Sequence, residues 1–148
     1  MSKKKKIIEI GVNACHSLLL MLLVNPTAEY LLFDLGSHKY TSPTFNYIKE
    51  TFPNAKLNII YGNSVDTISK YIKDNPNDTK SYDLIHIDGS HMKDVFSQDY
   101  INSKKLIRKN GIVIFDDYQL RNIKKFIDKK INKKEITKIK SKNLNDNP

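Results

Sequence analysis

Five short runs of hydrophobic residues recur along the chain, separated by longer segments of mixed polarity. The runs lack the strict alternation that marks a strand with one face in water, and their lengths are typical of strands buried on both faces. They predict strands at 6–10, 30–33, 57–61, 82–87 and 111–115.

The segments between these runs have helical spacing of their apolar residues, which predicts helices at 16–24, 42–52, 64–72 and 92–107. Regular alternation of strand and helix with short connections favours right-handed crossovers. We therefore expect an α/β fold, a three-layer, Rossmann-like, doubly wound and mostly parallel sheet with helices on both faces. A sixth strand at 135–140 would extend this sheet from five to six strands. The length of 148 residues suits a single domain over 1–148.

Two classes of protein are excluded early. The longest apolar run, 18–24, has seven residues, whereas a helix needs about 20 to span a bilayer. The lysine-rich start imitates a secretory signal, but Glu9, Asn13 and His16 interrupt the apolar region that would follow, so we expect a cytoplasmic protein without a membrane partner. The single cysteine, Cys15, excludes an internal disulfide and a cysteine-based zinc cluster.

The formal net charge of +9 suggests a polyanionic partner until the charges are placed along the chain. Residues 3–6 are all lysine, and 119–142 hold ten lysine or arginine residues against two acidic ones, whereas 7–118 hold eleven basic and thirteen acidic residues. A nucleic-acid-binding module remains an alternative. It is not favoured, because arginine is scarce and Phe126 is the only aromatic residue among the lysines. An amphipathic helix with Ile123, Phe126, Ile127 and Ile131 inward, followed by a basic tail over about 132–148, explains the same residues.

Glycine and short polar side chains gather where the predicted strands end. Gly11, Gly36, Gly62 and Gly89 each follow a strand within three residues, and each of these ends also carries Asn, Asp or Ser. In an open parallel sheet such ends converge on the carboxyl edge, where ligands bind. The alternative for any one of them is a helix cap or a turn. The recurrence of these residues at the strand ends favours a ligand-binding edge.

The first three strand ends indicate a nucleotide-type cofactor. Gly11 and Asn13 form a glycine turn that leads into a helix N-terminus, where N–H groups attract an anionic group. No Gly-Lys-Ser/Thr follows, so the turn is not a P-loop, and Asn13 makes it a poor dinucleotide motif. Asp34 ends the second strand, the position from which an acid binds ribose hydroxyls. Asn63 and Ser64 face a base or simply cap the next helix.

The fourth and fifth strand ends are acidic. Asp88, Asp116 and Asp117 end adjacent strands, and three carboxylates at one edge would repel one another unless a hard cation, most plausibly Mg²⁺, neutralised them. His91, three residues after Asp88, would accept a proton from a hydroxyl whose pKa the metal lowers; the alternative is an exposed residue at a helix start. His86 lies inside the fourth strand, and we interpret it as structural.

From residue 7 to 118 the chain resembles the class I S-adenosylmethionine-dependent methyltransferases, in particular the small branch with Asp-Gly-Ser-His after strand four and Asp-Asp after strand five. It looks most like metal-dependent O-methyltransferases that act on sugar hydroxyls. The resemblance implies that S-adenosylmethionine is the cofactor and that a small-molecule hydroxyl is the acceptor. The implied roles are cofactor binding by Glu9, Gly11, Asn13, Asp34, Asn63 and Ser64, Mg²⁺ binding by Asp88, Asp116 and Asp117, and catalysis by His91 as general base together with Asp88.

The chain also departs from that family. Cys15 stands where the family turn normally has glycine, and its β-carbon is expected to crowd the cofactor carboxylate. The family usually has an N-terminal helical segment and two further C-terminal strands, so we expect a minimal, truncated or degenerate enzyme, or one that completes its site as a homo-oligomer. A catalytically silent methyltransferase-like domain that serves as an assembly partner is a further alternative. The acceptor itself is not identified by the sequence.

Overall fold

The computed structural model describes residues 5–139 of the chain. These residues divide into two compact units, which meet in sequence between Asp116 and Asp117. The first unit holds the sheet and four helices, and the second holds the last helix. The expectation of a single domain over 1–148 stays a prediction.

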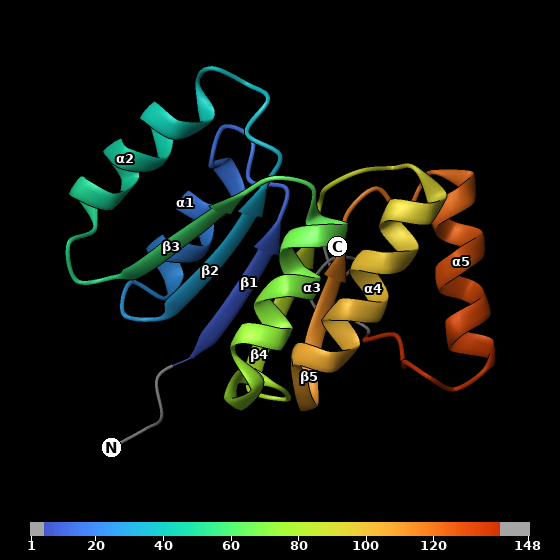
Figure 1. The fold of residues 1–148 in the computed structure, drawn as a ribbon. Coiled ribbons are helices and arrows are strands. Elements are labelled where there is room, and N and C mark those ends of the chain that lie inside the picture. The colour runs from blue at the N-terminus through green and yellow to red at the C-terminus, as the bar shows by residue number, and fades with distance from the viewer. Residues whose placement is uncertain (1–4, 140–148) are drawn as a thin grey trace, which may run out of the picture. The chain divides into compact units, whose positions relative to one another are not determined.

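The first unit is built on five parallel strands in the order β3-β2-β1-β4-β5 (Figure 1). From β1 the chain moves outward to β2 and β3, then returns to the other side of β1 for β4 and β5. This reversal puts a topological switch point between β1 and β4, at the carboxyl edge where ligands bind in such sheets. The strands are β1 (Lys6–Ile10), β2 (Glu29–Asp34), β3 (Lys56–Tyr61), β4 (Tyr82–Ile87) and β5 (Ile107–Phe115).

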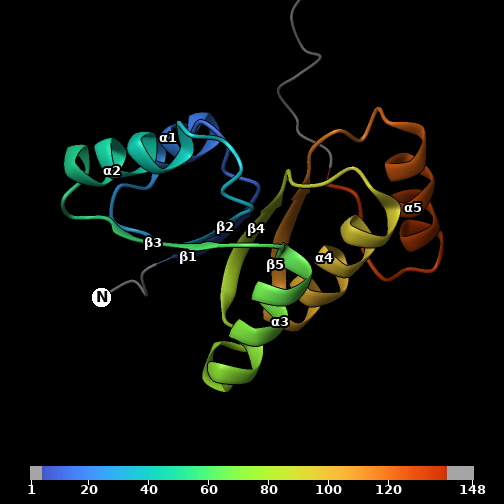
Figure 2. The same cartoon turned by 45° about the horizontal axis from the view of Figure 1, so that its top comes forward.

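Helices cover both faces of this sheet, as the sequence predicted. Figure 2 shows α1 and α2 on one face and α3 and α4 on the other. Within residues 5–139, no helix combines the length and the hydrophobicity needed to cross a bilayer. The helices of the first unit are α1 (His16–Val24), α2 (Thr41–Thr51), α3 (Ser64–Asp74) and α4 (Lys93–Leu106), with a short 3₁₀ turn at Pro76–Asp78.

Each face of the sheet buries its own set of side chains. On the α1/α2 face, Leu18 and Leu22 of α1 and Phe45 and Ile48 of α2 pack with alternate residues of β1 and β2, because successive strand residues point to opposite faces. The other face is rich in aromatic contacts: the ring centroids of Phe33 and Tyr71, of Phe96 and Phe115, and of Tyr100 and Phe115 all lie 6.0 Å apart.

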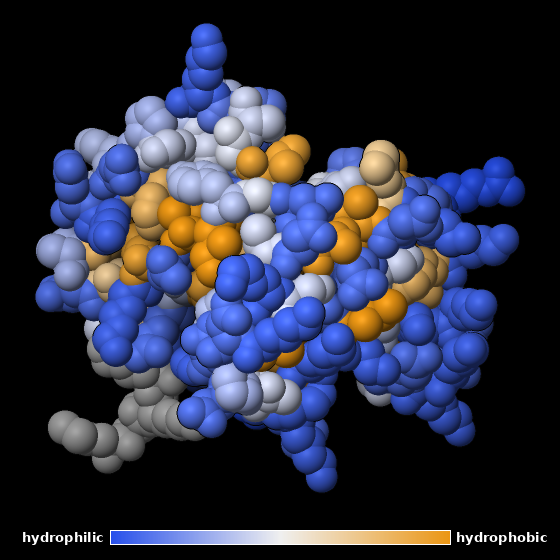
Figure 3. All heavy atoms as spheres, in the orientation of Figure 1, coloured by the Kyte–Doolittle hydropathy of each residue, from blue (hydrophilic) through white to orange (hydrophobic). Residues whose placement is uncertain are grey.

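The helices do not cover this second face completely. Figure 3 shows hydrophobic side chains beside α3, over the part of the sheet formed by β2 and β3, with hydrophilic side chains around them.

The structure corrects two strand predictions. β5 begins at Ile107 and contains Gly111, whereas the sequence predicted a strand that opens at Gly111. The register explains the error: Tyr82 pairs with Ile107 and Leu84 with Ile112, so the strand carries an irregularity at Asn110, which has φ +60°. The same boundary shortens the predicted helix 92–107, because Ile107 belongs to the strand.

The sixth strand predicted at 135–140 is wrong for 135–139, which form no strand, and Lys140 lies outside the described residues. The backbone N–H of Glu135 donates to the carbonyl of Lys130, and Lys134 has φ +57°, so the chain turns back on the end of the preceding helix. That helix is α5 (Arg121–Asn132), which buries Ile123 and Ile127 as the amphipathic pattern predicted.

Candidate active site

The turn after β1 is held in place from two sides. Gly11 has φ +87°, and a β-carbon at this position would lie only 2.1 Å from the carbonyl oxygen of Asp88. On the other side, Asp34 Oδ2 accepts hydrogen bonds from the backbone N–H groups of Val12 and Asn13, both at 2.9 Å. The exits of β1, β2 and β4 are therefore joined directly, as the sequence predicted for a carboxyl edge.

The side chain of Asp34 also stabilises the backbone of two turns, which the sequence did not predict. Its Oδ1 accepts the backbone N–H of Gly36 at 2.8 Å while Oδ2 accepts the two N–H groups of the β1 turn. A carboxylate has about four acceptor positions, so Oδ1 retains one for a ligand hydroxyl. The side chain fixes the turn and still keeps the capacity for the ribose contact predicted from the sequence.

Glu9 lies beneath the turn, fully buried. Its Oε1 accepts the hydroxyl of Ser17 in a short hydrogen bond and lies 3.1 Å from Nδ1 of His86. Burial lowers the pKa of this imidazole, but the hydrogen bond to Glu9 and the charges of Glu9, Asp88 and Asp116 together raise it. The pKa of His86 therefore lies above its ordinary value. His86 is a partner of Glu9, in keeping with a structural role.

The end of β3 supplies the next two predicted residues. Asn63 is the N-cap of α3, and its Oδ1 accepts the backbone N–H of Val65 at 3.1 Å. Ser64 follows as the first residue of α3 and is half-buried. The cap that the sequence left as an alternative for Asn63 is present, and the predicted contact with a base stays a prediction.

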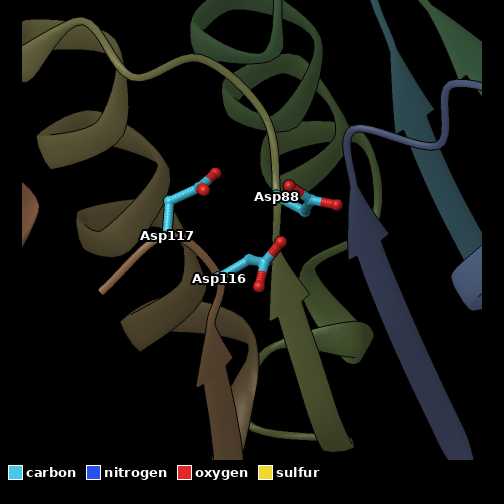
Figure 4. A group of neighbouring side chains, drawn as sticks. All are labelled: Asp88, Asp116 and Asp117. Carbon is cyan, nitrogen blue, oxygen red and sulfur yellow. The ribbon is translucent and has the colours of Figure 1, made fainter. Parts of the chain in front are cut away.

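The acidic ends of β4 and β5 come together. Asp88 follows β4, and Asp116 and Asp117 follow β5, with their carboxylates directed into a shared space (Figure 4). One oxygen of each lies within 4.8 Å of one oxygen of the others. The backbone N–H of Asp116 donates to the carbonyl of Ile87, which sets the two strand ends side by side. Three carboxylates at this spacing suit a hard divalent cation.

His91 follows Asp88 by three residues but does not join the group of carboxylates. It occupies the turn between β4 and α4, two residues before the helix begins, and its side chain is exposed. The group of possible metal ligands contains the three aspartates and does not include His91. Its predicted role as general base stays a prediction.

Cys15 is a buried residue at the end of the turn after β1, and the expected crowding of the cofactor carboxylate stays a prediction. Its backbone is left-handed at φ +62°, and its side chain is buried in the core cluster with Leu18 and Leu22. Burial, followed by the charges of Glu9 and Asp34, raises the pKa of the thiol to about 11. The thiol is therefore neutral at physiological pH and acts as a small hydrophobic side chain.

Sequence reasoning missed two residues at this edge. The hydroxyl of Tyr40 donates to Oδ1 of Asn13 at 2.6 Å, across 27 positions of sequence. Asp99 of α4 is fully buried, and Oδ2 of its carboxylate would lie 3.8 Å from a β-carbon placed on Gly89. Neither has a local sequence signal, because each depends on which loops and helices the fold brings together.

The fold and this edge define the class. A parallel sheet in the order β3-β2-β1-β4-β5 with helices on both faces is a Rossmann-like fold that solved methyltransferase structures share. Residues 8–118 match the model of a methyltransferase domain family, so the chain belongs to that family. Among curated protein sequences, none matches the chain.

Solved structures share the fold. A Staphylococcus aureus protein named as a caffeoyl-CoA O-methyltransferase aligns with a TM-score of 0.57 and 19% identity over 88% of this chain and 64% of its own. The CurJ carbon methyltransferase aligns at 0.59 and 15%, over 98% and 46%. Spermidine synthase from Thermotoga maritima aligns at 0.51 and 18%, over 84% and 44%. At these identities the likeness shows the fold alone, and the chain spans 44 to 64% of the length of these three proteins.

Proposed function

We propose that the chain is an S-adenosylmethionine-dependent methyltransferase that methylates a hydroxyl of a sugar or another small molecule with the help of Mg²⁺. The observation that carries the proposal is the close approach of Gly11 to the backbone of Asp88. It joins a turn suited to the cofactor with a carboxylate group suited to a metal, at the switch point between β1 and β4.

The residues on the cofactor side fit such a molecule. A β-carbon on Gly11 would clash with the backbone of Asp88, so the glycine allows the turn after β1 to pack directly against the exit of β4. Cys15 gives no side-chain hydrogen bond to the first turn of α1, so the N–H groups there remain for an anionic group. Asp34 Oδ1 would accept a ribose hydroxyl, and Asn63 and Ser64 would lie by the base.

The residues on the metal side are chemically matched to Mg²⁺. Asp88, Asp116 and Asp117 supply only oxygen ligands, the kind that this cation prefers. When bound, the cation lowers the pKa of a hydroxyl that it binds. The acidic group would thereby place the acceptor beside the cofactor, and orientation is the main requirement of an in-line displacement.

His91 would complete the reaction as proton acceptor. Transfer breaks the bond between the sulfonium sulfur and the methyl carbon and forms a bond from that carbon to the acceptor oxygen, while the hydroxyl proton passes to a ring nitrogen of His91. The structural neighbours include an O-methyltransferase, a carbon methyltransferase and a spermidine synthase by name. The choice of a hydroxyl acceptor therefore rests on the carboxylates and not on the neighbours.

Calorimetry with S-adenosylmethionine, with and without Mg²⁺, tests the cofactor. We expect micromolar binding in both conditions, because the cofactor residues and the metal residues are different ones. Asp88→Asn and Asp116→Asn should leave this affinity within about threefold, as should the exposed control Glu50→Gln. Absence of cofactor binding, with salt-dependent binding of an oligonucleotide instead, would favour the polyanion-binding alternative.

A transfer assay against a panel of sugar and phenolic hydroxyls tests the chemistry. We expect product with Mg²⁺ and none with EDTA, and a loss of at least about 100-fold in Asp88→Asn and in His91→Gln. Glu50→Gln should keep full activity. Cofactor binding without any product would support the catalytically silent domain, and EDTA-resistant transfer would contradict the metal.

A further inference from the structure

The loop between β2 and α2 reaches back to the turn after β1. Tyr40, the residue before α2, donates its hydroxyl hydrogen to Oδ1 of Asn13 at 2.6 Å. Its ring stacks on the imidazole of His38 with centroids 5.0 Å apart and planes only 7° from parallel. The phenol is 46% exposed, so the bond adds little to folding stability and its effect is to orient the amide.

Asn13 is already fixed through its backbone. It has φ +49°, and its N–H donates to Asp34 Oδ2 at 2.9 Å. Tyr40 fixes the remaining freedom, that of the side chain. Because the phenol donates to the amide oxygen, it fixes the amide with Oδ1 toward Tyr40 and with the Nδ2 group, which is a donor only, directed away from it.

The surroundings of this amide favour an anion. Asn13 stands two residues before Cys15, the N-cap of α1, whose first turn receives no side-chain hydrogen bond from that cap. The positive end of the helix and an oriented NH₂ group therefore act at the same place. A carboxylate suits such a pair of donors better than an uncharged group does.

We propose that Tyr40 is a positioning residue that holds the Asn13 amide with its NH₂ group toward the carboxylate of the amino-acid part of the cofactor. The inference rests on the proposed function and adds a residue that selects ligands carrying this carboxylate. His38 supports the phenol by stacking on it.

Two ligands that differ only in the amino-acid part test this role. S-adenosylhomocysteine carries the carboxylate, whereas 5′-methylthioadenosine has the same nucleoside and thioether without it. In Tyr40→Phe, calorimetry should show affinity for S-adenosylhomocysteine reduced about five- to tenfold and affinity for methylthioadenosine unchanged. The matched control is Tyr47→Phe, a tyrosine of α2 that is 69% exposed, and it should change neither affinity.

A double-mutant cycle separates positioning from a general effect on the loop. Asn13→Gly removes the amide and tolerates the positive φ, so it should weaken S-adenosylhomocysteine binding by itself. Tyr40→Phe added to Asn13→Gly should then have no further effect, because Tyr40 acts through the amide.

The outcomes are distinct. Equal weakening of both ligands in Tyr40→Phe, additive effects in the double variant, or no effect at all would each overturn the role of Tyr40 while leaving the cofactor in place. If the wild-type protein binds neither ligand, the proposed cofactor itself is contradicted, and this inference with it.

Discussion

Gly11 is the residue at which the proposed cofactor-binding turn contacts the exit of β4, which carries Asp88. Its φ of +87° is a backbone conformation that L-amino acids adopt only at a cost in free energy. A β-carbon at this position would also lie 2.8 Å from Cα of Gly89. Relief would require the exits of β1 and β4 to separate, which would disturb the hydrogen bonds that the N–H groups of the turn donate to Asp34. The glycine is therefore needed for conformation and for space together.

We expect Gly11→Ala to lower the free energy of unfolding by at least about 2 kcal/mol, through backbone strain and the clash with Asp88. Urea denaturation measures this loss. The control is Gly89→Ala, whose β-carbon would find its nearest neighbour, Ile10 Cγ2, at 3.4 Å, so it should cost less than about 1 kcal/mol. Similar costs for the two variants would show that the close approach of the two turns does not contribute to stability.

At the scale of single elements, α4 carries a buried acid against the exit of β4. Asp99 is fully buried, and both of its carboxylate oxygens are removed from water. Burial raises the pKa of this carboxyl to about 6, although the Ser64 hydroxyl opposes the rise. The folded protein thus holds the proton up to a pH at which the unfolded chain, with a pKa near 3.8, has already lost it.

This difference sets the sign of a pH effect on stability. Between about pH 4 and pH 6 the folded state binds more protons than the unfolded state, so the contribution of Asp99 to stability falls as the pH rises and then stays low. Asp99→Asn should remove this fall and raise the free energy of unfolding at pH 7 by about 2 to 3 kcal/mol. Urea denaturation from pH 4 to pH 8 measures it. An unchanged pH profile in Asp99→Asn, compared with Glu50→Gln, would contradict the assignment.

The element scale also shows what sequence reasoning reaches and what it does not. Asp88 and Asp116 were predictable neighbours, since the ends of consecutive parallel strands meet at one edge. The pairing of Glu9 with His86 was not, because it depends on the register between β1 and β4, which hydrophobic runs do not specify.

The early start of β5 escaped prediction for a related reason. Lys109 and Asn110 are polar and interrupt the apolar run, yet the strand absorbs them through an irregularity in its register against β4. The contact between Tyr40 and Asn13 joins loops that only the tertiary fold brings together. Local pattern thus located the elements and the acidic edge, and the contacts that orient its side chains required the three-dimensional structure.

At the scale of the whole molecule, the charge of +9 is separated from the proposed chemistry. The basic excess of the described residues belongs to the second unit, where Lys125, Lys129 and Lys133 are exposed on or directly after α5. The turn after β1, Asp88 and Asp116 belong to the first unit, and Asp117 is the first residue of the second. Lysine without interleaved aromatic residues attracts phosphate through charge alone, which makes binding depend on salt and not on sequence.

We therefore expect weak binding of a mixed-sequence oligonucleotide that declines steeply between 50 and 200 mM salt, measured by fluorescence anisotropy. Replacing Lys125, Lys129 and Lys133 by Gln should lower the slope of log K against log salt by about 3, if each contacts one phosphate. The affinity for S-adenosylmethionine should stay unchanged in this variant, because none of the three lysines is among the proposed cofactor residues. Two results would contradict this expectation: loss of cofactor binding in the lysine variant, or displacement of the oligonucleotide by the cofactor. Either would show that the cofactor and the oligonucleotide bind at one site, and that the basic residues are not separate from the proposed chemistry.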